Sequence, residues 1–338
     1  DPAAPRWRET LEKLASFPVD EKTGLAIGRG VPLAMSHRHF SHLLLFYPLH
    51  VADPDDPAMR PLLERSLDHW ISFEGALQGY SFTGASAMSS WLRRRGPNAD
   101  LLNQFLDRYV KANTMYLEAG PVIETPLAGA AAIHEILLQS WAREPFGTEI
   151  RVFPAVPDAW PDATIHRLRA EGAFLVSAAR RGGRTRFVRI ESLAGAPCRV
   201  ETGIEGEIAA RGARAFRTET AAGPGGRRIT TVDLRRGEAV LLLPAGAAAE
   251  EAPAVEAVAE QPDRRNLYGS PKPARVRPEA DGSYVLRAKD AVLSGDRLML
   301  ERKSKEGNIG GWVVSEASIA WHVDVRTPGR FEVVVVCA

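Results

Sequence analysis

The chain has 338 residues, of which 45% are hydrophobic and 25% charged, and its 43 Lys and Arg nearly balance 42 Asp and Glu. This composition excludes wholesale disorder, and a net charge of +1 gives no basic field, so we expect no nucleic-acid partner. The two cysteines, Cys198 and Cys337, are far apart, which argues against a disulfide scaffold and a zinc cluster. The apolar runs are too short to cross a membrane, so no membrane partner is expected either.

Residues 1–147 are predicted to be helical. Apolar residues recur at helical spacing after Pro5, and again over 57–73, 87–92, 98–110 and 133–141. Amphipathic helices of this kind, separated by loops, indicate stacked helical hairpins.

The hydrophobic period changes near Ile150. Residues 187–191, 198–201 and 229–234 alternate as strands do, and 240–243 read as a fully buried strand. Glycine and proline separate these runs at short intervals. The pattern predicts an antiparallel β-sandwich over residues 148–245.

The composition changes again after residue 245. Residues 246–282 are rich in Ala, Glu and Pro and are predicted to be a linker. Residues 283–338 are predicted to be a β-domain, with a hairpin that pairs 321–325 with 331–333 around a Pro328-Gly329 turn. Because so few strands cannot easily form a stable sheet, we expect this domain to be truncated.

The segment from His37 to Leu43 holds three of the eight histidines, His37, His39 and His42, together with Arg38. Imidazoles with a carboxylate could bind a metal, whereas Arg and His donors could bind sugar hydroxyls or an anion. An ordinary role in helix capping or core hydrogen bonds is the third explanation. The metal hypothesis is the weaker of the two functional ones because no His-Glu-x-x-His pattern is present.

Glu124 is the second candidate. It follows apolar residues in a short loop that enters a helix of small residues. Partial desolvation would raise its pKa and suit it to acid or base catalysis. An acid at a helix N-terminus also complements the helix dipole, and on spacing alone this structural role is the stronger explanation.

Four segments resemble glycoside hydrolase family 95. Residues 37–49 are similar to its HRHxSHL…YP signature, and Gly79-Tyr80-Ser81 is similar to its GWS segment. Residues 135–140 are similar to its EMLLQS helix, and residues 153–172 to its LPALP…W…LRARGG run. The four segments follow the order of the family and span roughly residues 20–200.

The resemblance implies an (α/α)6 barrel followed by a β-sandwich, and inverting, exo-acting hydrolysis of α-L-fucosides or related α-linked sugars without a cofactor. The family's base-side acid precedes the Glu of EMLLQS by eleven residues, a count that leads back from Glu135 to Glu124. Arg38 and His39, with His37 and His42, would then bind the hydroxyls of an oligosaccharide or polysaccharide.

The chain also departs from the family pattern. Glu124 replaces an Asp, and residues 125–128 replace the family's Gly-Asn-Phe-Gly. A catalytically inactive carbohydrate-binding relative is therefore an alternative, and so is a different glycan substrate. The family's general acid and water-holding Asn residues would precede Asp1, so we expect the C-terminal part of a longer enzyme, with one wall of the active site.

The tail gives a second resemblance. Residues 291–295, 308–312 and 321–323 are similar to the accessory β-domain beside some family 29 fucosidases. Because polysaccharide-degrading enzymes of this design are usually exported, the resemblance implies a secreted or periplasmic protein.

Overall fold

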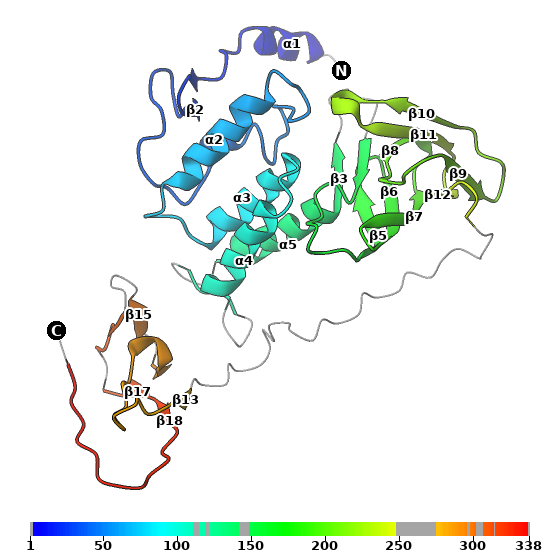
Figure 1. The fold of residues 1–338 in the computed structure, drawn as a ribbon. Helices are drawn as coiled ribbons and strands as arrows, with labels where there is room; N and C mark the ends of the chain where they lie inside the picture. The colour runs from blue at the N-terminus through cyan, green and yellow to red at the C-terminus, as the bar shows by residue number, and fades with distance from the viewer. Residues whose placement is uncertain are drawn as a thin grey trace. The chain divides into compact units, whose positions relative to one another are not determined.

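The computed structural model consists of two compact units, Asp1–Arg265 and Asn266–Ala338 (Figure 1). Their division falls inside the predicted linker 246–282, most of which lies outside the described residues. The described residues are 3–110, 115–118, 122–141, 149–247, 275–295, 298–301, 307–313 and 315–336.

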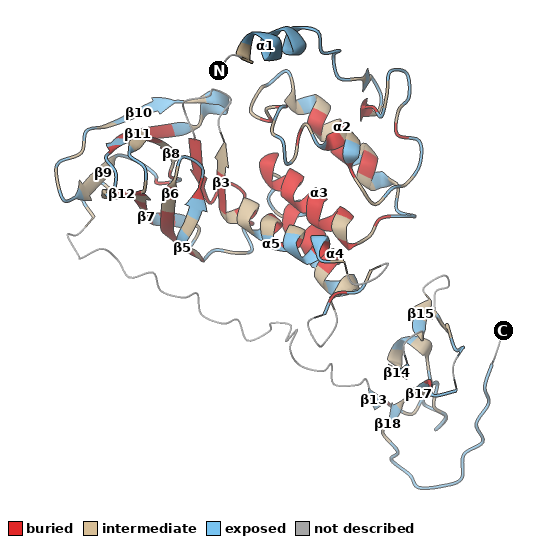
Figure 2. Ribbon diagram, turned by 180° about the vertical axis from the view of Figure 1, so that it is seen from behind, coloured by how far each residue is buried: buried red, intermediate tan, exposed pale blue. Residues whose placement is uncertain are grey.

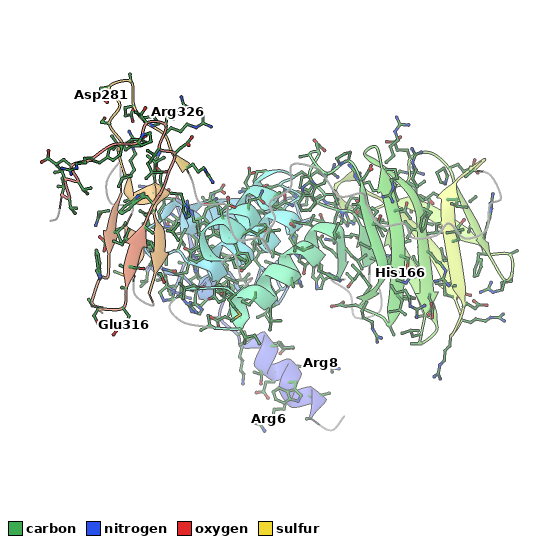
Figure 3. The ribbon with its side chains drawn as sticks, turned by 90° about the horizontal axis from the view of Figure 1, so that it is seen from below. Arg6, Arg8, His166, Asp281, Glu316 and Arg326 are labelled. Atoms are coloured by element: carbon green, nitrogen blue, oxygen red, sulfur yellow. The ribbon has the colours of Figure 1, made fainter. Side chains whose placement is uncertain are left out.

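The first unit begins with helices, as the periodicity predicts. Of these, α1 has no buried residue, and Figure 3 shows its Arg6 and Arg8 side chains extending away from the rest of the unit. None of the helices in the described residues is long and apolar enough to span a membrane. The elements are α1 (Ala4–Glu12), β1 (Val19–Asp20), β2 (Gly24–Leu25), the short 3-10 helix η1 (Ser41–Leu43), α2 (Arg60–Ser72), α3 (Gly79–Trp91), α4 (Pro97–Tyr109) and α5 (Glu124–Leu137).

Helix α3 is buried on almost every side, as its red colour in Figure 2 shows. It packs against both α4 and α5. Close packing on several sides requires small side chains, and α3 supplies them with Gly84, Ala85, Ser86 and further Ala and Ser residues. A Cβ atom added at Gly84 would lie 2.4 Å from the Phe40 ring, so glycine is required where the loop before η1 crosses α3.

Gly84→Ala is expected to lower the free energy of unfolding by about 1–3 kcal/mol, because Phe40 would have to leave its place against Trp70 and Tyr80. Urea unfolding measures the change. Gly75→Ala is the matched control, since its added Cβ would make only an ordinary 4.0 Å contact with Ser36. Equal stability of the two variants would contradict this account of α3.

The helix predicted over 133–141 is wrong in its second half. Helix α5 ends at Leu137, and β3 (Leu138–Trp141) follows at once, paired with β4 (Glu149–Val152). Leu138 is fully buried with extended backbone angles. Its apolar run fits a helix or a strand equally well, and pairing with β4 decides in favour of the strand.

Two five-stranded sheets follow and confirm the four predicted strands. One sheet has the order β10-β11-β8-β4-β3, and the other has the order β5-β6-β7-β12-β9. Their inward residues share one core, and all pairs are antiparallel except β4 with β8, which is parallel. The remaining strands are β5 (Ala163–Ala170), β6 (Phe174–Arg181), β7 (Arg184–Ser192), β8 (Ala196–Glu201), β9 (Ile208–Gly212), β10 (Thr218–Ala222), β11 (Arg228–Leu234) and β12 (Ala239–Pro244).

A buried network of charges joins the helical part to the sheets. Arg227 contacts Asp55 at 3.1 Å, Glu201 at 3.2 Å and also Glu149. Arg151 contacts Asp55 at 2.9 Å and Glu149 at 3.3 Å. Arg93 adds a bidentate pair with Glu201, at 2.7 and 3.0 Å. We call these six residues the junction network. It contains three cations and three carboxylates, and a fourth cation, the 43% exposed Arg199, lies at its edge, 3.7 Å from Glu149.

The second unit contains three two-stranded pairs in its described part. The pairs are β13 (Arg275–Val276) with β18 (His322–Val323), β14 (Val292–Ser294) with β17 (Ser318–Ala320), and β15 (Met299–Glu301) with β16 (Asn308–Gly310). The predicted hairpin is wrong: residues 331–336 form no strand, and β18 pairs in parallel with β13. Alternation along a strand shows that pairing is possible but does not choose the partner.

Candidate active site

Three segments that are distant in sequence meet at the N-terminal ends of α3 and α5. They are the loop before η1, the start of α3 and the Tyr116–Glu118 segment before α5. The hydroxyl of Ser81 donates to the carbonyl oxygen of Arg38 at 2.7 Å, and the rings of His39 and Tyr80 lie 5.4 Å apart. The two predicted motifs, residues 37–43 and Gly79-Tyr80-Ser81, therefore form one site.

Arg38 is the centre of this site. Its Nε donates to Nε2 of His39 at 2.8 Å, its Nη1 donates to Glu118 and its Nη2 donates to Glu124. The structure therefore brings together three predicted residues, Arg38, His39 and Glu124. The planar guanidinium holds its three partners in fixed directions, which a lysine could not do.

Glu118 is the residue that sequence reasoning missed. Its side chain is fully buried, and its Oε2 accepts from Tyr116 Oη at 2.5 Å and from Thr125 Oγ1 at 3.0 Å. It lies in a short segment with no periodic pattern. The sequence offered one indication of a role for Glu118, which is its position six residues before Glu124.

Glu124 differs from Glu118 in its access to solvent. Its side chain is 43% exposed, whereas the Glu118 side chain is 0% exposed. Glu124 begins α5, so it lies at a helix N-terminus, as the structural explanation predicts, and its carboxylate also pairs with Arg38. Of these two acids, only Glu124 can reach a water molecule.

His37 and His39 shape the loop around Arg38. Nδ1 of His37 accepts the backbone N–H of His39 at 3.1 Å, and the carbonyl of His37 accepts Trp70 Nε1–H at 3.0 Å. Because Nε2 of His39 accepts from Arg38, the ring of His39 carries its proton on Nδ1. His37 is exposed, so its Nε2 remains available to a ligand.

His42 is the predicted residue that these contacts do not include. It lies in η1, and within the described part of the chain no hydrogen bond, ion pair or ring contact joins it to Arg38 or His39. Burial, with a smaller contribution from nearby His69, lowers the pKa of His42 to about 4, so the ring is neutral at physiological pH. No group of three or more His, Cys, Asp or Glu side chains suited to a metal occurs among the described residues.

One comparison with known proteins identifies a family. Residues 146–238, which include most of the two sheets, match the model for the C-terminal domain of glycoside hydrolase family 95. A search of curated proteins found no match to the chain. The match confirms the family that the motifs resemble, although residues 37–140 lie outside the matched range. Over residues 146–238 the chain is therefore similar to the C-terminal domain of glycoside hydrolase family 95.

Proposed function

We propose that the protein is an inverting, exo-acting glycosidase for α-L-fucosides or related α-linked sugars. The observation that carries the proposal is the ion pair between Arg38 and the exposed acid Glu124, which brings together two segments resembling the family's substrate-binding and base-side motifs. The helices would belong to an (α/α)6 barrel whose other part supplies the general acid. We also propose that the enzyme is exported.

The charges of the site favour a neutral sugar. Two carboxylates, Glu118 and Glu124, surround the single guanidinium of Arg38, so this wall carries an excess negative charge. A uronic acid would meet repulsion there, whereas sugar hydroxyls find donors on His37 and His39 and acceptors on Glu124.

In this mechanism Glu124 removes a proton from the attacking water, and the general acid protonates the leaving oxygen from the opposite face of the sugar. Inversion requires the two carboxyl groups to lie about 6.5–9.5 Å apart, with the water between the sugar and the base. Arg38 holds Glu124 in place, while His39 contributes a donor for a hydroxyl of the sugar.

Glu124→Gln is expected to lower kcat by about 10²–10⁴-fold, because an amide cannot accept the proton. The natural full-length protein is incubated with fucosylated oligosaccharides, and NMR identifies the anomer that is released first. Glu74→Gln, at an exposed residue between α2 and α3, is the control. Retention of the anomeric configuration would overturn the proposal, and glycan binding without hydrolysis would favour the inactive carbohydrate-binding alternative.

A further inference from the structure

Glu118 is a buried acid with every oxygen in use. Oε1 accepts from Arg38, and Oε2 accepts from the hydroxyls of Tyr116 and Thr125. A carboxylate without solvent contact is costly unless a cation and hydrogen-bond donors compensate it. Arg38 supplies the cation, and Tyr116 and Thr125 supply the donors. The hydrogen-bond partners of the Glu118 carboxylate are therefore all side chains of the protein, and Glu118 has no free oxygen for a ligand.

The same carboxylate connects the two parts of the candidate active site. Through Arg38 it holds the loop before η1, and through Thr125, which is fully buried, it holds the first turn of α5. A Cβ atom at Gly79 would lie 3.0 Å from the Thr125 methyl and 3.3 Å from Glu118 Oε2, so glycine at the start of α3 leaves room for this connection.

The charge of Glu118 also acts on Glu124. Arg38 has two carboxylate partners, one buried and one exposed. The buried partner already balances the guanidinium charge, so the exposed carboxylate does not meet a full uncompensated cation. A fully paired carboxylate would be a poor base, because its negative form would be over-stabilised. Among the described residues, the other groups facing Glu124 are His39, through Arg38, and Tyr80 of α3.

We propose that Glu118 is a positioning residue of the glycosidase site: it fixes the guanidinium of Arg38 and balances its charge, so that Glu124 is held in place and still accepts a proton from water. The inference rests on the proposed function for its catalytic meaning. Its electrostatic part concerns the groups of this chain alone and can be measured without turnover.

Glu118→Gln in the natural full-length protein is expected to lower kcat about 10–100-fold with a smaller change in KM, because Arg38 loses its fixed direction. It is also expected to move the acid limb of the pH–kcat profile to lower pH, because the guanidinium then acts on Glu124 alone. Carbon-13 NMR of labelled glutamate carboxyls, with Glu124→Gln to assign the signal, should show the same displacement in the titration of Glu124.

Two further variants separate charge from packing. Glu118→Asp keeps the charge and should return the titration of Glu124 towards that of the wild type, even if the rate remains low. Tyr116→Phe removes a hydrogen bond to Glu118 without changing any charge, so it should leave that titration in place while it lowers the melting temperature.

The outcomes distinguish the two proposals. If the wild type hydrolyses the glycans and Glu118→Gln changes neither kcat nor the titration of Glu124, the inference about Glu118 is overturned. A wild type that hydrolyses none of the glycans overturns the proposed function, and the NMR titration then decides the inference on its own. Circular dichroism of each variant checks that the fold is retained.

Discussion

Arg227→Met is expected to lower the free energy of unfolding by about 3–5 kcal/mol, because it removes the cation shared by the three carboxylates of the junction network, Asp55, Glu149 and Glu201. The side chains of Arg227, Asp55 and Glu149 are each less than 10% exposed. Methionine keeps most of the volume but leaves the three carboxylates with two cations inside the network, because the remaining cation, Arg199, is 43% exposed at its edge. Urea unfolding at pH 7 measures the loss.

The pH dependence of this loss follows from Glu201. Burial opposes its ionisation, but hydrogen bonds and charge from Arg93 and Arg227 outweigh burial, so the pKa of Glu201 lies below its ordinary value of 4.5. Its contribution to stability is therefore present above pH 4.5 and is lost as the pH falls through the lower, folded-state pKa. The difference between wild type and Arg227→Met should shrink over that acidic range.

Two controls test the cause. Arg217→Met, at an exposed arginine, should change the stability by less than about 0.5 kcal/mol. Adding Glu149→Gln to Arg227→Met should recover part of the lost stability, because it removes the negative charge of a buried carboxylate that has lost its contact with Arg227. If the double variant is less stable than Arg227→Met alone, an unbalanced buried charge is not the cause.

Glu135→Gln is expected to stabilise the protein at alkaline pH. Burial raises the pKa of Glu135 on α5 to about 8, with nearby Arg151 opposing the rise. A raised carboxyl pKa means that the folded state holds a proton that the unfolded chain has released, so wild-type stability falls as the pH rises from 4.5 to about 8. Glutamine copies the neutral form and removes this fall.

The gain should be small at pH 5 and should reach about 2–4 kcal/mol at pH 9. Thermal and urea unfolding at both pH values measure it, with Glu219→Gln, at an exposed residue of β10, as the control. A gain of the same size at pH 5 and pH 9 would show that Glu135 does not titrate in this range.

Strong periodicity in the sequence was enough to predict the helices α2 and α4 and the strands β7, β8, β11 and β12. For α3 it marked only residues 87–92, because a helix that is buried on almost every side has no polar face. It failed where a short apolar run fits two structures: Leu138 to Trp141 joined a sheet because β4 lay alongside it. The strand predicted at 331–333 is absent for a related reason, because strand pairing depends on a partner distant in the chain.

The candidate site was predictable only where its residues stand in a local motif. Arg38, His39 and Glu124 belong to such motifs, and the structure brings them together. Glu118 belongs to none, because its role depends on burial and on Arg38, 80 residues earlier in the chain. His42 shows the reverse. It belongs to the motif, yet its ring is partly buried near His69, and among the described residues no hydrogen bond joins it to Arg38, His39 or Glu124.

The direct passage from α5 into β3 restricts how the protein can change in length. Glu124 and the first paired residue of the sheet, Leu138, are the two ends of one helical segment about 21 Å long. One inserted or deleted residue would turn Glu124 about 100° around the helix axis, or shift β3 by one position and exchange its inward and outward faces. Since no loop absorbs the change, residues 124–138 should keep a fixed length wherever Glu124 and Arg38 act together.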